Sequence, residues 1–151
     1  MKHILPQIAK NQIFLTTLCA WLIAQTIKVI IGIIRQKRFD FRWFVGTGGM
    51  PSSHAAGASC LATAIGLEYG FDSAYFALAA SFALVIMFDA QGVRRATGRQ
   101  ARILNKITDD IYWQGRITEG RLRELVGHTP FEVLIGFLVG VGVAVLARII
   151  T

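Results

Sequence analysis

Four stretches of the chain are too apolar and too poor in charge to lie on the surface of a water-soluble domain. Residues 13–34 carry one charged side chain, Lys28, and residues 48–67 carry none apart from a histidine. A helix needs about 20 apolar residues to cross the hydrocarbon core of a bilayer. The composition agrees, since 54% of the residues are hydrophobic and 17% are charged. We therefore predict a membrane protein.

The predicted fold class is all-α, a single integral membrane domain over residues 1–151 built as a polytopic helix bundle. About four transmembrane helices are expected, over residues 13–34, 48–67, 73–88 and 133–151. The first stretch follows basic residues as a signal peptide does, but its apolar core is too long and no small-x-small cleavage site follows it. It is therefore predicted to be a span.

Residues 96–127, between spans three and four, are rich in polar side chains. Within them Ile103, Ile107 and Ile111 recur at every fourth position. This spacing is typical of an amphipathic helix. We expect the segment to lie on the membrane surface or to pack beneath the bundle.

Two small residues predict a close contact between helices. Gly136 and Gly140 form a G-x-x-x-G pattern in span four, which permits close approach of two helices in lipid. Packing inside one bundle is the simpler interpretation, and contact within a homodimer is the alternative.

The chain is basic, with 16 Lys and Arg against 9 Asp and Glu and a formal net charge of +7. Such a charge suits nucleic acid, anionic lipid or a phosphorylated substrate. Nucleic acid is disfavoured, because the basic residues lie between the apolar spans and not in a separate module. Twelve lie in the loops after spans one and three, against three on the other side. The positive-inside rule therefore predicts that these loops face the cytoplasm and that both termini face outside. The expected location is a membrane of the bacterial plasma membrane type.

Three polar motifs fall at span ends that share one side of the membrane. They are TGGMPSSH at residues 47–54, DAQGVRR at residues 89–95 and GHTPFE at residues 127–132. With four spans, the start of span two, the end of span three and the start of span four lie at one surface. The motifs are thus predicted to line one pocket.

The residue types in this pocket suit a phosphate. Gly49, Ser52 and Ser53 lie at the start of a helix, where backbone N–H groups and hydroxyls bind anions. Arg94 and Arg95 can add planar cationic groups that match phosphate oxygens. The predicted ligand is therefore a phosphate group.

Two histidines and one glutamate could catalyse a reaction of the bound phosphate. Of His54 and His128, one can attack phosphorus while the other protonates the leaving oxygen, with neither metal nor cofactor. Glu132 follows His128 by four residues, one helical turn, where it could hold the ring through one nitrogen. The simpler interpretation is an ordinary helix start with Glu132 as its capping residue.

Three further charged residues lie at or near the predicted pocket. Lys28 lies inside span one, where an unpaired charge costs ~2.5 kcal/mol or more, so it should face a polar interior. Snorkelling to the membrane surface is the alternative. Arg35 follows two turns later. Asp89 is expected to pair with an arginine, and no metal site is predicted. His3 is assigned no role.

These motifs carry a resemblance to a known superfamily. The string PSSH at residues 51–54 looks like the P-S-G-H motif of the type 2 phosphatidic acid phosphatase and vanadium haloperoxidase superfamily. Residues 127–136 resemble its last motif, a histidine followed by proline, an acid and an apolar helix. The three motifs together are similar to a divergent, short branch of bacterial and plastid membrane proteins, over the chain from Gln25 to Gly136.

The resemblance implies roles for the site residues. The histidine of the last motif forms a phosphohistidine in the superfamily, which here would be His128, with Glu132 in place of the usual Asp as its orienting partner. His54 would be the general acid. Ser52 and the backbone of Ser53 would bind phosphate oxygens, although Ser53 stands where Gly is usual.

The other motifs of the superfamily match in part. The usual first motif is Lys, six residues, then Arg-Pro. Lys28 and Arg35 have this spacing, with Gln36 in place of Pro, and Lys37 and Arg38 compete for the same role. Leu122 stands where an arginine usually precedes the last histidine, and the flanking Arg121 and Arg123 are alternative phosphate ligands. The resemblance therefore assigns phosphate binding to Lys28 and Arg35, and we expect the pair Arg94–Arg95 to replace the missing arginine.

The sequence thus predicts a membrane phosphatase that hydrolyses a lipid or isoprenoid phosphate monoester through a phosphohistidine, without a metal or other cofactor. The alternative is a non-catalytic membrane protein that binds anionic lipid headgroups or partner proteins through the same pocket. A transporter is disfavoured, since four short helices lack inverted repeats. The expected partners are the phosphate substrate and the bilayer, without nucleic acid, and the homodimer stays open.

Overall fold

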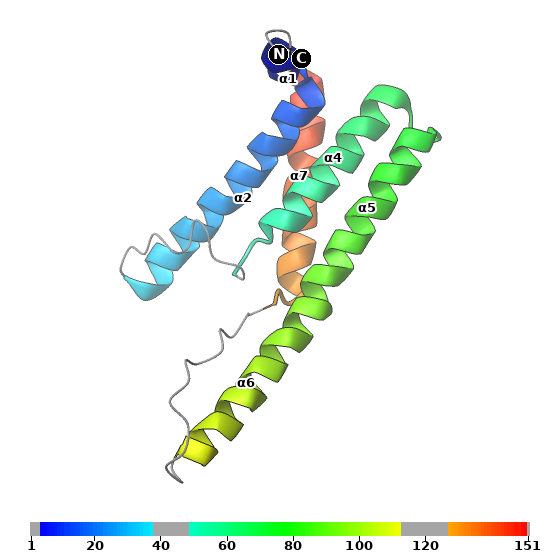
Figure 1. The fold of residues 1–151 in the computed structure, drawn as a ribbon. Helices are drawn as coiled ribbons and strands as arrows, with labels where there is room; N and C mark the ends of the chain where they lie inside the picture. The colour runs from blue at the N-terminus through cyan, green and yellow to red at the C-terminus, as the bar shows by residue number, and fades with distance from the viewer. Residues whose placement is uncertain (1–3, 38–48, 113–126, 151) are drawn as a thin grey trace.

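The computed structural model describes residues 4–37, 49–112 and 127–150. These residues form helices and no strand, which confirms the predicted all-α class (Figure 1). The helices are α1 (Ile4–Lys10), α2 (Gln12–Gln36), α4 (Ser53–Tyr69), α5 (Ala74–Gln91), α6 (Val93–Tyr112) and α7 (Pro130–Ile150).

Helix α4 is the centre of the bundle, because it packs against α2, α5 and α7. Helices α2 and α7 also contact each other. Figure 1 shows both chain ends at the end of the bundle where α4 turns into α5. The start of α4, the end of α5 and the start of α7 lie at the opposite end. The three polar motifs flank these helix ends, so the fold gathers them on one side.

Polar residues set where the helices begin and end. Side-chain oxygens of Asn11, Ser52 and Ser73 each accept a hydrogen bond from the backbone N–H three residues later, at 3.0, 3.3 and 3.1 Å. Such caps replace the bonds that the first turn of a helix lacks. The C-cap residue of α2 is Lys37, in the left-handed region (φ 50°), and that of α4 is Gly70, with φ 90°.

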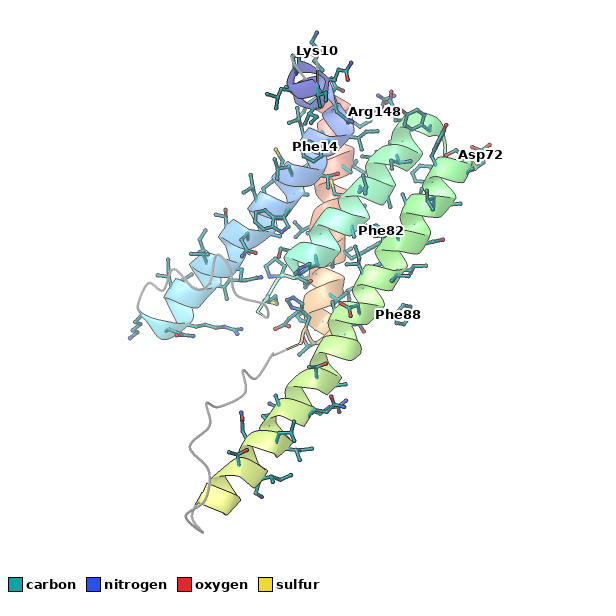
Figure 2. The ribbon with its side chains drawn as sticks, in the orientation of Figure 1. Lys10, Phe14, Asp72, Phe82, Phe88 and Arg148 are labelled. Atoms are coloured by element: carbon teal, nitrogen blue, oxygen red, sulfur yellow. The ribbon has the colours of Figure 1, made fainter. Side chains whose placement is uncertain are left out.

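The core of the bundle consists of small side chains, while large apolar ones face outward. Ala58, Ala62, Ala79 and Ala83 are buried between α4 and α5. Phe88, by contrast, is 72% exposed and projects away from the bundle (Figure 2). Without a hydrophobic driving force between helices in lipid, small residues at the contacts let the helices pack closely. This inside-out distribution is that of a membrane helix bundle.

Three helices are long and apolar enough to cross a membrane by length and composition. They are α2, the run Ala74–Thr108 that joins α5 to α6, and α7. Helix α4 has 17 residues and begins at Ser53 rather than at residue 48, because Ser52 caps it. The predicted bounds of the other spans agree with the helices to within a few residues. A count of four spans therefore stays a prediction.

Two helices differ from the sequence expectations. Helix α1 was not predicted, because its seven residues are too few to show a periodic pattern. The predicted amphipathic segment is helix α6, which begins at Val93 and is described as far as Tyr112; residues 113–126 lie outside the described part. Figure 1 shows α6 running on from α5 beyond the bundle.

The G-x-x-x-G pattern packs inside the chain. A Cβ atom on Gly136 would overlap the Ser52 carbonyl oxygen, and one on Gly140 would overlap the Ala56 carbonyl and the Ser59 hydroxyl. The Ser59 hydroxyl also donates to a backbone carbonyl of α7 at 3.1 Å. The two glycines therefore let α7 and α4 meet backbone to backbone, just below the polar motifs.

Candidate active site

The two histidines of the polar motifs lie beside each other. His54 is the second residue of α4, and His128 precedes the start of α7 by two residues. Their ring centroids are 6.4 Å apart and the ring planes meet at 61°. His128 is only 2% exposed, and His128 Nε2 and His54 Nδ1 are both buried. The fold thus pairs two imidazoles that lie far apart in the sequence.

Glu132 both caps α7 and contacts the ring of His128. Its Oε2 accepts the Thr129 N–H at 2.9 Å, while the Glu132 N–H donates to the Thr129 hydroxyl at 3.3 Å. This reciprocal pair is a capping box, with Pro130 in the favoured first position of the helix. The same Oε2 lies 3.3 Å from His128 Nδ1. The structure thus shows the cap, and the contact with the His128 ring is the one that the predicted orienting role requires.

The contact between Glu132 and His128 has a chemical consequence. When Nδ1 carries the proton and donates it to the carboxylate, the lone pair of the neutral ring is on Nε2. A nearby carboxylate also stabilises the positive charge that the ring gains when Nε2 forms a bond. This arrangement suits a nucleophile or a proton carrier at Nε2.

Two backbone hydrogen bonds connect the three motifs. The His128 N–H donates to the Ala90 carbonyl at 3.1 Å, and the Ser52 N–H donates to the Glu132 carbonyl at 3.0 Å. The first joins the start of α7 to the end of α5, and the second joins it to the start of α4. Sequence reasoning missed both contacts, because a backbone bond has no side-chain signature. The Thr-x-x-Glu capping pattern, by contrast, was readable from the sequence.

The start of α4 is the helix end at which the sequence predicts anion binding. Ser52 and Ser53 are buried, and the Ser52 hydroxyl accepts the Ala55 N–H. The first N–H groups of a helix point out of its end and favour a negative charge there. The exposed Gly49 precedes this turn with φ 85°, a conformation that glycine adopts without strain. A cis peptide bond joins Met50 to Pro51.

Lys28 reaches this site from α2. It is 8% exposed, and its aliphatic stem passes the Gly49 backbone, where an added Cβ atom would lie 3.5 Å from Lys28 Cγ. Gln25, one turn earlier, is also buried. Lys28 is therefore buried against Gly49 inside the bundle, and its role in the site stays a prediction.

The structure does not gather every predicted residue. Arg35 is exposed on the last turn of α2, and among the described residues no contact joins it to the histidine pair. Asp89 is half-buried on α5, next to Ala90. Arg94 and Arg95 belong to the first turn of α6, and their side chains lie outside the described part, as do Arg121, Leu122 and Arg123. Their roles stay predictions.

The ionisable groups described around the histidine pair are the two imidazoles, the Glu132 carboxylate and the Lys28 ammonium, while Asp89 lies at the end of α5 and Arg35 is exposed on the last turn of α2. Within residues 4–37, 49–112 and 127–150, no three His, Cys, Asp or Glu side chains are grouped so that they could hold a metal ion. An ammonium and a helix N-terminus beside two imidazoles can bind an anion and move protons on it.

The comparisons with known proteins agree with these motifs. The chain matches the family described as the Divergent PAP2 family over residues 9–143, a range that holds every motif described above. The uncharacterized membrane protein YuiD of Bacillus subtilis (strain 168) is 40% identical over 146 residues, which cover 89% of this chain and 92% of that protein. No solved structure matches the chain. The chain therefore belongs to the divergent PAP2 family.

Proposed function

We propose that this protein is a membrane phosphatase that hydrolyses a lipid or isoprenoid phosphate monoester through a phosphohistidine at His128. The observation that carries the proposal is the pairing of His54 and His128, with ring centroids 6.4 Å apart and Glu132 at Nδ1 of His128. Membership of the divergent PAP2 family supports a phosphatase-related role.

The separation of the two rings suits one phosphoryl group between them. In-line transfer needs the nucleophile on one side of phosphorus and the proton donor at the leaving oxygen on the other side. Each must lie about 3 to 3.5 Å from the atom with which it reacts. Rings 6.4 Å apart, with different orientations, can meet both distances with modest adjustment.

The reaction then runs in two steps. In the first, Nε2 of His128 forms a bond to phosphorus, the bond from phosphorus to the ester oxygen breaks, and His54 donates a proton to that oxygen so that the alcohol leaves. In the second, water attacks phosphorus, His54 takes a proton from it, and the bond from nitrogen to phosphorus breaks. The products are inorganic phosphate and the original histidine.

The remaining residues bind the phosphate oxygens. The start of α4 offers N–H groups and the Ser52 hydroxyl, and Lys28 supplies a positive charge from a buried position. Such charges are more effective in a site from which water is excluded. Gly49 and His54 are more exposed than His128, so the substrate approaches from their side. The apolar tail of a lipid substrate stays in the bilayer beside the bundle.

The direct test is hydrolysis by purified protein in detergent. Phosphate release is measured from phosphatidic acid, lysophosphatidate, phosphatidylglycerophosphate and a polyprenyl phosphate. His128→Ala should abolish turnover, and His54→Ala should lower it about 10²- to 10⁴-fold, the usual contribution of a general acid. His3→Ala is the matched control and should leave turnover unchanged. Wild-type protein that releases phosphate from none of these substrates would contradict the proposal.

Two further measurements separate catalysis from binding alone. A phosphoenzyme trapped with labelled substrate should be acid-labile, alkali-stable and absent from His128→Ala. Vanadate, which adopts the five-coordinate geometry of the transition state, should inhibit turnover. A non-catalytic headgroup-binding protein would instead bind anionic vesicles but form no phosphoenzyme and release no phosphate.

A further inference from the structure

Helix α6 carries an apolar row that no other part of the described chain covers. Ile103, Leu104 and Ile107 are 60%, 48% and 48% exposed. Within the described residues, α6 packs only against α5. The three side chains lie on one face, because residues three and four apart are neighbours on a helix. An exposed apolar row of this kind indicates a surface that binds a membrane or another protein.

A row of positive charge runs beside the apolar one. Arg99, Arg102 and Lys106 are exposed and follow the same spacing of three and four residues. Over its whole length, the sequence of α6 holds five Lys and Arg against two Asp, a net charge of +3. A helix with an apolar face and a basic face suits the interface of an anionic membrane.

The position of α6 in the fold places it near such an interface. Helix α5 has 18 residues and is therefore about 27 Å long, close to the thickness of the hydrocarbon core. Helix α6 begins directly after it, across Gly92, at the end of the bundle that holds the histidine pair. Its first residues thus lie at the level of the lipid headgroups.

We propose that α6 is a docking arm for anionic lipid headgroups, on the leaflet at which the histidine site opens. The apolar row enters the boundary between headgroups and acyl chains, while Arg99, Arg102 and Lys106 contact lipid phosphates. Docking requires α6 to turn at Gly92 away from the line of α5 on which Figure 1 shows it. Glycine at this junction permits the turn, because it lacks a Cβ atom.

A second copy of the chain is the competing occupant of this face. Pairing two α6 helices through their apolar rows would bring two basic rows, each part of a helix of net charge +3, close together. Like charges repel, whereas anionic headgroups attract the same row. Charge complementarity therefore favours lipid. The proposal does not depend on phosphatase activity, since docking is measured by itself.

The test follows an environment-sensitive dye at position 104 in nanodiscs. Leu104→Cys is labelled with bimane in full-length protein that also carries Cys19→Ser and Cys60→Ala. Discs of phosphatidylcholine alone are compared with discs that contain roughly 30% phosphatidylglycerol, a composition with strong negative surface potential. In the anionic discs we expect blue-shifted emission and quenching by nitroxide-labelled lipid, both reduced by high salt.

Two variants with equal charge loss make the test specific. Arg99→Gln/Arg102→Gln should lower the ratio of docked to undocked arm roughly 30-fold, since each cation near such a surface contributes about fivefold. Lys2→Gln/Lys10→Gln should leave the ratio unchanged. Emission that is the same in both kinds of disc overturns the proposal. Energy transfer between dyes on two copies also overturns the proposal if it rises with protein density and does not depend on lipid charge. That result identifies a second copy as the occupant.

Discussion

Gly136→Ala should weaken the bundle at the point where it supports the candidate site. The new methyl group would overlap the Ser52 carbonyl oxygen and lie 3.1 Å from the Ala55 Cβ atom. The obstructing atom belongs to a backbone, so no side chain can rotate away and α7 must move from α4. Ser52 caps α4 and contacts α7 through its N–H, so the displacement reaches the predicted phosphate-binding end.

The magnitude follows from two opposing effects. Overpacking of a well-packed contact costs about 1–3 kcal/mol, while replacing glycine by alanine in a helix gains about 1 kcal/mol. Gly142 lies in the same helix, and a Cβ atom there would meet nothing within 4 Å. Gly142→Ala therefore shows the gain alone. The difference in unfolding free energy between the two variants isolates the overpacking, about 1–3 kcal/mol.

Thermal unfolding in detergent measures this difference. For a chain of this length, 1 kcal/mol corresponds to about 2–4 °C in Tm, so Gly136→Ala should unfold about 2–12 °C below Gly142→Ala. Phosphate release should fall with Gly136→Ala and persist with Gly142→Ala. Equal Tm values for the two variants would show that the close α4–α7 contact is absent. The start of α4 and the start of α7 would then not lie together as the candidate site requires.

Three further substitutions test single contacts. Glu132→Gln keeps a capping oxygen but removes the charge beside His128. Tm should therefore stay within about 2 °C, while turnover should fall about 10- to 100-fold, which is the value of a charged hydrogen bond. An unchanged rate of phosphate release would exclude the orienting role. Lys28→Met should weaken vanadate inhibition about 10-fold or more, whereas Lys10→Met, on an exposed residue at the opposite end of the bundle, should not. Equal inhibition constants for wild type and Lys28→Met would remove Lys28 from the site. Ser59→Ala loses a hydrogen bond to α7 at 3.1 Å and should lower the stability by about 0.6 kcal/mol, seen as a Tm about 1–3 °C lower; an unchanged Tm would mean that this bond adds nothing.

The apolar runs allowed most of the helices to be predicted, because lipid demands long uninterrupted stretches. The bounds of α2, α5 and α7 follow these stretches closely. The bounds of α4 do not, because its start depends on the cap at Ser52 and not on hydropathy. The short helix α1 left no periodic signal. Local hydrogen bonds therefore decided what composition could not.

The candidate site divides in the same way. An even number of helices between two polar motifs returns the chain to the same side, so the sequence alone indicated that His54 and His128 share one end of the bundle. The capping pattern around Glu132 was also readable, since it is local. Neither pattern indicates how far apart the two imidazole rings lie.

Only the tertiary structure decided how close the two rings come. Their separation of 6.4 Å depends on the contact of α4 with α7 at Gly136 and on the hydrogen bond from the His128 N–H to the Ala90 carbonyl. The helix contact and the hydrogen bond both involve backbone atoms, which every residue possesses, so no pattern of side chains in the sequence predicts them. Residue types thus determined which groups lie at this end of the membrane, and backbone packing between distant helices determined that they meet.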